Sequence, residues 1–383
     1  MVINMKEFSK LIIKNLYKSY GNFEVLKDFN QTLERGEFVT FLGPSGCGKS
    51  TALNCICGLI PITNGEIFID DECIDNGIDI CIPPEKRGFG MVFQNYALFP
   101  HLTVFLNIAF GLQLKKMNKN EIKKRVDQAI SIVHLEGHEN KYPGQLSGGQ
   151  QQRVAIARCI VLEPRLLMLD EPLSNLDAKL RLEMRYELKT LHERLRISTI
   201  YVTHDQQEAL ALSNKIVVMK RGLVQQIGTP QEIYSRPSNL FVADFMGYKN
   251  LWTGKIVKFN DNGNAVEMTL DINGVSIISR FVYSKNETAR KLFLENLFIN
   301  GKEIVTAIRP EDIVSGDGPL NCFDCRIDVM EYQGKVSDVS AFINENLKVD
   351  ARPECKACIG DSIRLYIPPE KVLVFAREEG RSA

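Results

Sequence analysis

Residues 38–51 read Phe-Val-Thr-Phe-Leu-Gly-Pro-Ser-Gly-Cys-Gly-Lys-Ser-Thr. The first five residues predict a buried strand, and the run from Lys49 onward predicts a helix. Between them lies the pattern G-x-x-x-x-G-K-[ST], whose glycines let backbone N–H groups converge on phosphate oxygens. A strand that leads into a phosphate-binding loop and then a helix indicates an α/β sheet.

The composition is that of a soluble globular protein with two domains. The chain has 383 residues, 44% of them hydrophobic, and equal numbers of basic and acidic residues, 47 each. A net charge of zero gives no bulk reason for binding to nucleic acid or to an anionic membrane. The first residues lack the pattern of a signal peptide, and without export the ten cysteines are expected to be mostly free thiols.

The alternation of strands and helices predicts two domains, 1–240 and 241–383, with a helical subdomain at about 95–160. In the first domain we expect strands at 11–17, 38–42, 166–169 and 199–202, and helices at 118–134 and 176–195. After Pro237 short runs separated by Asn-Gly and Asp-Gly turns predict an all-β, barrel-like module. The seam is expected between Ser235 and Asn250.

One long segment, Gly88 to Leu114, contains no Asp, Glu, Lys or Arg. It is long enough to span a bilayer, but its Gln, Asn, Pro and His residues would be costly in hydrocarbon. We therefore interpret it as buried and interfacial protein surface.

The loop from Gly43 to Thr51 carries the first part of a nucleotide site. Lys49 is expected to hold the β- and γ-phosphates, and the Ser50 hydroxyl to bind Mg²⁺. Cys47 lies at a helix N-terminus, which should lower its pKa. The full binding set in this loop is Gly43, Pro44, Ser45, Gly46, Cys47, Gly48, Lys49, Ser50 and Thr51.

Further candidates stand at the ends of other predicted strands. Asp170 ends an apolar strand, where its carboxylate could reach the Mg²⁺ shell, and Glu171 beside it could polarise the attacking water. Gln94 could bind Mg²⁺ or water. His204 ends the next strand, so the same edge of the sheet is expected to hold it.

A second glycine-rich turn, Ser147-Gly148-Gly149, opens the helix predicted for Gln150 to Ile160. Helix N-termini of this kind bind anions. Two half-sites for a triphosphate in one chain indicate that two chains must meet to complete each site.

The first domain resembles the ATP-binding cassette (ABC) ATPases, because it carries the family's motifs in the family's order and spacing: the glycine loop, Gln94, 146–150, 166–171, 174–177 and His204. The resemblance implies a P-loop NTPase core with ATP and Mg²⁺ as cofactors. It implies that Tyr20 stacks on adenine, Gln94 senses Mg²⁺, Glu171 is the catalytic base and His204 contacts the γ-phosphate. The set that acts in trans, on the ATP of a second copy, would be Ser147, Gly148, Gly149, Gln150 and Asp177. Asn175, where alanine is commoner in the family, departs from the pattern.

Residues 91–112 and 203–210 look like those of importer subunits for polyamines, ferric iron, sulfate, phosphonates or oligosaccharides. The run 308–312 resembles the oligonucleotide-binding-fold-like regulatory domain of such subunits, for which nucleic-acid binding is not expected. The resemblance implies a homodimer at the cytoplasmic face of the membrane, with permease subunits docked near 94–114 and, indirectly, an extracytoplasmic solute-binding protein. Polyamine, ferric iron or a related small ion or organophosphonate is the expected solute.

A soluble ABC ATPase of DNA repair or translation is the alternative. Such proteins usually carry two cassettes or long coiled-coil insertions, and this chain shows one cassette and no heptad run. Neighbouring permease genes would separate the two functions.

Two cysteine pairs in the second domain, Cys322 with Cys325 and Cys355 with Cys358, could provide four zinc ligands. The gap between the pairs exceeds the usual spacing, and residues three apart in a strand face opposite sides. A metal-regulated sensor is therefore the minor hypothesis for this domain. His134 and His138 are four apart, but Gly137 interrupts the helix, which argues against a metal pair.

Overall fold

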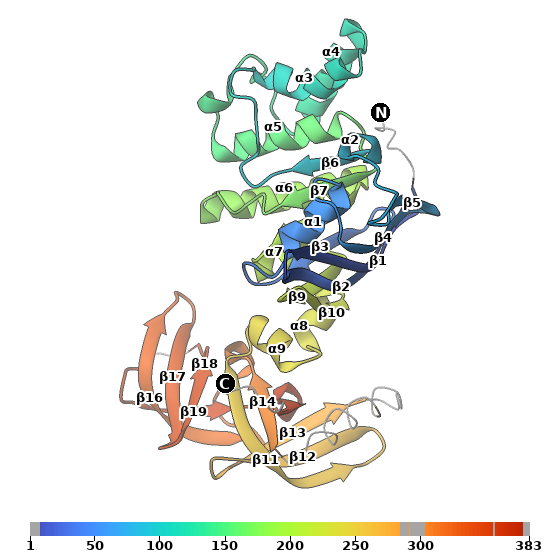
Figure 1. Ribbon diagram of the computed structural model, residues 1–383. Helices are drawn as coiled ribbons and strands as arrows, with labels where there is room; N and C mark the ends of the chain where they lie inside the picture. The colour runs from blue at the N-terminus through green and yellow to red at the C-terminus, as the bar shows by residue number, and fades with distance from the viewer. Residues whose placement is uncertain (1–7, 284–290, 292–302, 355–356, 378–383) are drawn as a thin grey trace. The chain divides into compact units, whose positions relative to one another are not determined.

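The computed structural model describes residues 8–283, 291, 303–354 and 357–377 (Figure 1). The chain separates into two compact units, Met1–Arg236 and Pro237–Ala383. The sequence predicts this division after residue 240.

The central sheet of the first unit has six strands in the order β10-β9-β3-β8-β7-β6. All neighbours are parallel except β10, which pairs antiparallel with β9. The strands are β3 Phe38–Leu42, β6 Phe89–Val92, β7 Leu166–Asp170, β8 Ser198–Thr203, β9 Lys215–Lys220 and β10 Leu223–Gly228. Because β3, β8, β7 and β6 run in one direction, the residues that follow them share one edge of the sheet.

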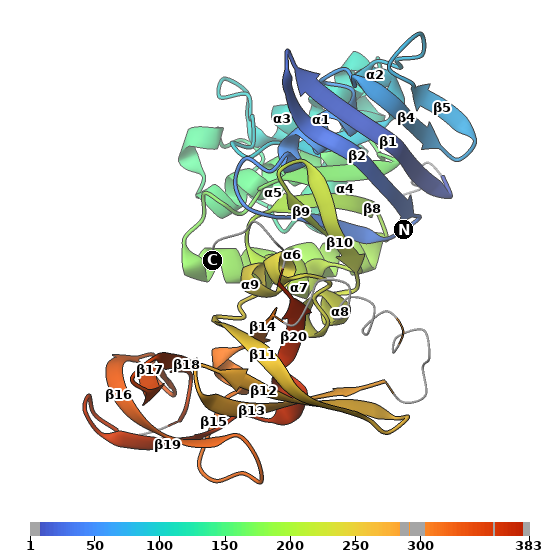
Figure 2. The ribbon, with the colours of Figure 1, turned by 60° about the horizontal axis from the view of Figure 1, so that its bottom comes forward.

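A second, antiparallel sheet has the order β2-β1-β4-β5 and is drawn in blue in Figure 2. Its strands are β1 Lys10–Tyr20, β2 Phe23–Glu34, β4 Asn64–Ile69 and β5 Glu72–Asp75. Helix α1, Lys49–Cys57, buries Ala52, Leu53 and Ile56 in one apolar core with residues from both sheets. The helix that begins at the phosphate loop is thereby fixed along its length.

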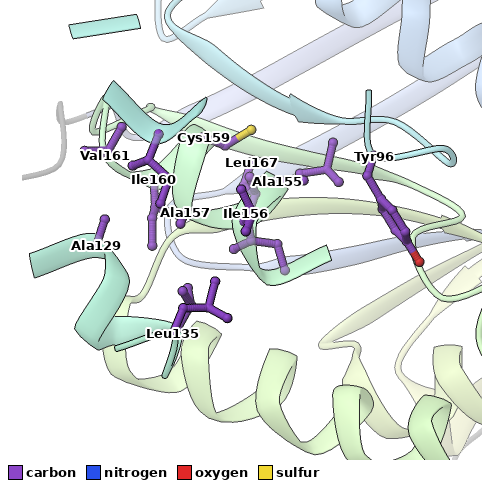
Figure 3. Close-up of a cluster of buried hydrophobic side chains, with 14 of the residues drawn as sticks. Tyr96, Ala129, Leu135, Ala155, Ile156, Ala157, Cys159, Ile160, Val161 and Leu167 are labelled. Atoms are coloured by element: carbon purple, nitrogen blue, oxygen red, sulfur yellow. The ribbon is translucent and has the colours of Figure 1, made fainter. Parts of the chain in front are cut away.

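Figure 1 shows the helical subdomain, α3, α4 and α5, gathered at one end of the first unit. Asn118 caps α4 by accepting from the Glu121 amide. Part of the core is shown in Figure 3, where side chains of α4, α5 and β7 gather with Tyr96. The helices of this unit are α2 Pro84–Arg87, α3 Val104–Leu114, α4 Lys119–Ile132, α5 Gly148–Ile160, α6 Ala178–Leu195, α7 Gln206–Leu212 and α8 Pro230–Ser235, with a 3₁₀ turn η1 at Pro143–Gln145.

The described part of the chain contains no helix with the length and apolar character needed to cross a bilayer. The uncharged stretch 88–114 is divided instead between β6, a loop and α3.

The second unit is β-rich, as predicted, with two five-stranded sheets of order β13-β12-β11-β14-β20 and β15-β19-β16-β17-β18. Residues of both sheets contribute to one apolar core. The Trp252 indole donates to the Lys348 carbonyl (3.0 Å), which ties the sheets together. The elements are α9 Leu240–Phe245, β11 Asn250–Asp261, β12 Ala265–Ile272, β13 Val275–Val282, β14 Glu303–Ile308, η2 Pro310–Asp312, β15 Val314–Ser315, β16 Cys322–Tyr332, β17 Ser337–Asn344, β18 Leu347–Ala351, β19 Ser362–Tyr366, η3 Pro369–Lys371 and β20 Leu373–Ala376.

A buried ion pair holds the end of α1 that is remote from the phosphate loop. Arg87 is 1% exposed and donates to the Asp75 carboxylate (2.7 Å). Its guanidinium also donates to the carbonyls of Ile82, Cys55 and Ile56 (2.7, 3.2 and 2.8 Å). Cys55 and Ile56 lie in the last turn of α1, the end of a helix at which a cation is favoured.

We expect Arg87→Ala to lower the free energy of unfolding by about 3–5 kcal/mol, because it leaves the Asp75 carboxylate buried without its cation. Urea denaturation followed by circular dichroism measures this. Replacing both partners, Asp75→Leu with Arg87→Met, should recover part of the loss.

Arg125→Ala is the matched control, since Arg125 pairs with Glu121 at the surface (2.8 Å). It should leave stability nearly unchanged. Equal effects of Arg87→Ala and Arg125→Ala would contradict a structural role for the buried pair.

Candidate nucleotide-binding and catalytic site

The loop between β3 and α1 is a compact backbone cradle. A Cβ atom on Gly43 would lie 2.4 Å from the Met219 carbonyl oxygen, and one on Gly48 would lie 2.9 Å from that of Val25. Gly48 also has a φ of 106°, which side-chain-bearing residues rarely adopt. These glycines are therefore required by the close approach of neighbouring backbone, and the loop leads into a helix N-terminus, which favours an anion.

Lys49 lies within this cradle and is 4% exposed. Its ammonium group donates to the carbonyls of Gly43 (2.8 Å) and Pro44 (3.0 Å). The cation is thus held over the loop where phosphate oxygens would bind.

Ser50 in the first turn of α1 lies next to Asp170 at the end of β7, the two residues that the sequence predicts for a Mg²⁺ site. The Ser50 hydroxyl donates to the Asp170 carboxylate (2.7 Å). Burial raises the pKa of Asp170 above its ordinary value, and the hydrogen bond from Ser50 opposes this shift. A hydroxyl and a carboxylate are the hard oxygen donors that Mg²⁺ prefers, so these residues fit that ion.

Gln94 follows β6 at the same edge of the sheet. Its amide donates to the Ser174 hydroxyl (3.2 Å), and its backbone carbonyl accepts from the Asn175 side chain (2.9 Å). Ser174 in turn donates to the Glu171 carbonyl (2.9 Å). The residue that departs from the family pattern, Asn175, therefore helps to fix Gln94.

Glu171 and His204 are brought together at the ends of β7 and β8. The Glu171 Oε2 lies 3.1 Å from the His204 Nδ1. Glu171 has a φ of 43°, an uncommon backbone conformation of the kind that concentrates at functional sites. The predicted base and the predicted phosphate contact thus form one polar pair.

A carboxylate to which the sequence analysis gave no role supports this turn. Glu208 is 4% exposed and accepts hydrogen bonds from the hydroxyls of Tyr201 (2.8 Å) and Thr203 (2.6 Å). Thr203 also accepts from the Asp205 amide (3.0 Å), which closes the turn that carries His204. Burial raises the pKa of Glu208. Its position within the run 203–210, shortly after His204, was the available signal.

The expected lowering of the Cys47 pKa is wrong. Cys47 is 3% exposed, and burial raises its pKa, while the charge of Lys49 lowers it by less. The helix N-terminus favours a thiolate, but loss of water around the sulfur outweighs that effect.

The second glycine-rich turn, Ser147-Gly148-Gly149, begins α5 with a capping box, in which Ser147 and Gln150 hydrogen-bond to each other. The Gln150 amide N–H donates to the Ser147 hydroxyl (3.4 Å), and the Ser147 amide donates to the Gln150 side-chain oxygen (3.0 Å). A Cβ on Gly148 would lie 3.0 Å from Leu176, and one on Gly149 would lie 3.0 Å from Leu180. The glycines therefore also allow α5 to pack closely against the start of α6.

The remaining predicted residues lie outside the cluster around Lys49. Asp177 caps α6 by accepting from the Leu180 amide (3.0 Å), and Leu176 and Leu180 on either side of it approach the glycines of the Ser147 turn. Within the described part of the chain, no hydrogen bond joins that turn to the phosphate loop. Tyr20 is 52% exposed, and the Lys18 ammonium lies 4.8 Å from its ring centroid. Its stacking on adenine stays a prediction.

The uncharged stretch is partly core and partly surface. Val104, Ile108 and Leu112 of α3 are fully buried. Phe93 and Leu114 are exposed, at 37% and 69%.

The cysteines of the second unit do not form a recognisable metal site in the described residues, where no three Cys, His, Asp or Glu side chains gather. Cys325 is buried, and burial raises its pKa to about 12, which disfavours the thiolate that zinc binds. The Cys322 sulfur accepts from the Gly318 amide (2.9 Å), and Cys358 is exposed. Cys355 lies outside the described residues, so zinc stays a prediction that metal analysis of the purified protein would test.

Comparison with known proteins identifies the cassette. A family model described as ABC transporter matches residues 26–174. The spermidine/putrescine import ATP-binding protein PotA of Clostridium novyi is 40% identical over 372 residues, covering 95% of this chain and 97% of the relative. PotA of Thermotoga maritima is 46% identical over 301 residues, covering 79% and 76%.

Solved structures agree with this match. CbiO1 from Clostridium perfringens, part of the ABC transporter complex CbiONQ, is 33% identical with a TM-score of 0.55, covering 60% of this chain and 92% of that one. The cassette MJ0796, dimeric and bound to ADP and phosphate, is 35% identical with a TM-score of 0.51, covering 57% and 98%. The predicted fold class is confirmed. At 40% identity over nearly its whole length, the chain belongs to the ATP-binding subunits of ABC transporters, which hydrolyse ATP to drive transport.

Proposed function

We propose that two copies of this chain bind two ATP molecules between them and power the import of a polyamine through separate permease subunits. The polyamine is inferred from the relatives named for spermidine and putrescine import. The proposed place of work is the cytoplasmic face of the membrane, with a solute-binding protein on the other side.

The ATPase activity is supported above all by two pairs of polar side chains that lie along one edge of the central sheet. The Ser50 hydroxyl lies 2.7 Å from the Asp170 carboxylate oxygen. The Glu171 Oε2 lies 3.1 Å from the His204 Nδ1. The first pair would hold Mg²⁺, which neutralises phosphate charge when bound. Glu171 would orient and deprotonate water, and Lys49 would bind the phosphates.

Dimerisation is supported by the separation of the half-sites within one chain. The turn Ser147–Gln150 has amides to offer an anion, yet it makes no hydrogen bond to its own phosphate loop. The related cassette MJ0796 is dimeric. In the proposed head-to-tail dimer, Ser147, Gly148, Gly149, Gln150 and Asp177 cap the ATP held by the partner's Lys49.

The proposed permease contact is the surface that begins at Gln94. Leu106 and Leu114 expose apolar area in this range, and no charged residue occurs from Gly88 to Leu114. Apolar surface without charge is suited to burial against another protein. Because Gln94 is hydrogen-bonded to Ser174, movement at this surface would reach the catalytic edge.

Growth complementation with the cognate permease tests the solute. Cells that lack polyamine import should take up radiolabelled spermidine or putrescine when the chain and its permease are present. Uptake of ferric iron or a phosphonate in place of polyamines would overturn the assignment of the solute while leaving the ATPase intact.

Glu171→Gln should slow ATP hydrolysis by roughly 10²–10⁴-fold, the usual contribution of a general base, while ATP binding persists. Since bound ATP would not be consumed, we expect the variant to accumulate as an ATP-bound dimer. Phosphate release and size-exclusion chromatography with light scattering measure both effects. Wild-type turnover would refute the role of Glu171 as base.

Lys49→Ala gives the contrasting control. Loss of the cation should weaken ATP binding by about 10–100-fold, because hydrogen bonds from charged groups are worth about 1.5–3 kcal/mol. Dimerisation should then fail at ATP concentrations that suffice for Glu171→Gln. Fluorescent ATP titration distinguishes the two variants.

The rate at which each cysteine reacts with a thiol reagent should decrease with the burial of its side chain. We expect Cys81 and Cys358, which are exposed, to react with a maleimide well before Cys47, whose thiol is buried with a raised pKa. Activity should survive the early labelling and fall as Cys47 is modified, and bound ATP should slow that loss. Mass spectrometry assigns each site. In a Cys47→Ala control, activity that falls at the wild-type rate would exclude Cys47 as the cause.

A further inference from the structure

The imidazole of His138 bridges the loop before α5 and the side chain of Gln150. Its Nδ1 lies 3.2 Å from the Glu136 carbonyl oxygen, and its Nε2 lies 3.1 Å from the Gln150 side-chain nitrogen. A carbonyl oxygen can only accept, so Nδ1 carries the proton in the neutral ring. The unprotonated Nε2 then accepts a hydrogen bond from the Gln150 amide.

The other atom of that amide belongs to the cap of α5. The Gln150 side-chain oxygen accepts from the Ser147 amide at 3.0 Å. If the amide rotated by half a turn, its NH₂ group would face the Ser147 N–H, and its oxygen would face the lone pair of Nε2. Both contacts would be repulsive, so the two partners specify one orientation of Gln150.

We propose that neutral His138 is a positioning residue for the Ser147–Gln150 turn, and that its protonation weakens the hold of this turn on ATP. The inference rests on the proposed dimer, in which the turn caps the partner's nucleotide. It concerns a residue outside the motifs singled out for nucleotide binding.

Protonation places a second N–H on His138, opposite the NH₂ group of Gln150. Two donors then face each other, and the amide can turn its oxygen to the ring only by giving up the Ser147 amide. The cap of α5 would lose one of its two hydrogen bonds, at the end of the helix that faces nucleotide.

The charged neighbours of His138 come from its own loop and from two helices. Glu136, Glu139 and Lys141 share the loop, and the Glu139 carboxylate accepts from the Gly137 amide at 3.0 Å. His134 also lies there, and its carbonyl accepts from Arg153 of α5 (3.4 Å). Arg153 pairs with Glu187 of α6. A test must therefore separate His138 from these charged neighbours.

The experiment measures KM for MgATP and kcat of the full chain between pH 5.5 and 8.5. We expect the KM of the wild type to rise about five- to tenfold at the acid end, the cost of one hydrogen bond, with kcat at saturating ATP changed by less. In His138→Gln the side-chain oxygen accepts from Gln150 at every pH, so KM should rise much less than in the wild type at the acid end. His138→Leu should show the raised KM throughout.

His134→Asn is the matched control, because it removes a histidine from the same loop and asparagine tolerates the φ of 53° found there. It should keep the pH dependence of the wild type. Taking each variant as a ratio to the wild type at the same pH cancels the contributions of groups that both proteins share. Equal pH profiles for the wild type and His138→Gln would overturn the inference.

Nitrogen-15 NMR of labelled histidine provides a readout that does not depend on ATP hydrolysis. At high pH, His138 should show the neutral form protonated at Nδ1, identified by the loss of its signals in His138→Gln. Protonation at Nε2 would overturn the inference even if every variant were inactive. If the wild type neither hydrolyses ATP nor dimerises while the Nδ1 form is observed, the proposed function fails and the positioning of Gln150 stands.

Discussion

The parallel pairing of β6, β7, β8 and β3 brings the residues that follow these strands to a common edge of the sheet. Ladder hydrogen bonds fix this register, with Leu42 beside Thr203 and Asp170 beside Val202. The sheet brings together residues that lie far apart in the sequence, namely Gln94, Glu171, His204 and the phosphate loop. Each group therefore follows a rigid, buried strand and is held in a fixed position. Fixed polar groups stabilise the charge that develops in a transition state.

Helix α1 connects the stability of the first unit with its chemistry. Its first turn begins at the phosphate loop, and its last turn is bound by the buried Arg87. Negative charge is favoured at the first end of a helix and positive charge at the last, so Arg87 and a bound phosphate act on the same macrodipole from opposite ends. The apolar residues between them belong to the core that both sheets share.

The parts of this structure that follow local rules could be predicted from the sequence. The strand ends at Asp170 and Thr203, the cap at Asn118 and the β-rich second unit all depend on short-range patterns. The pKa of Cys47 could not be predicted, because it depends on how much water neighbouring strands exclude. Glu208 and His138 were missed as supporting groups because their hydrogen-bond partners are set by folding, and a position near a motif residue does not identify those partners. The zinc hypothesis met the expected geometric difficulty, since Cys325 faces the core.

The packing of Gly148 and Gly149 against Leu176 and Leu180 has a mechanical meaning. The turn at Ser147 and the cap at Asp177 lie on different helices, yet close steric contact leaves no room for one to slide past the other. A partner that approaches this face meets a single stiff body with few degrees of freedom. Force generated at a nucleotide would pass into α5 and α6 together, and little would be lost in deformation between them.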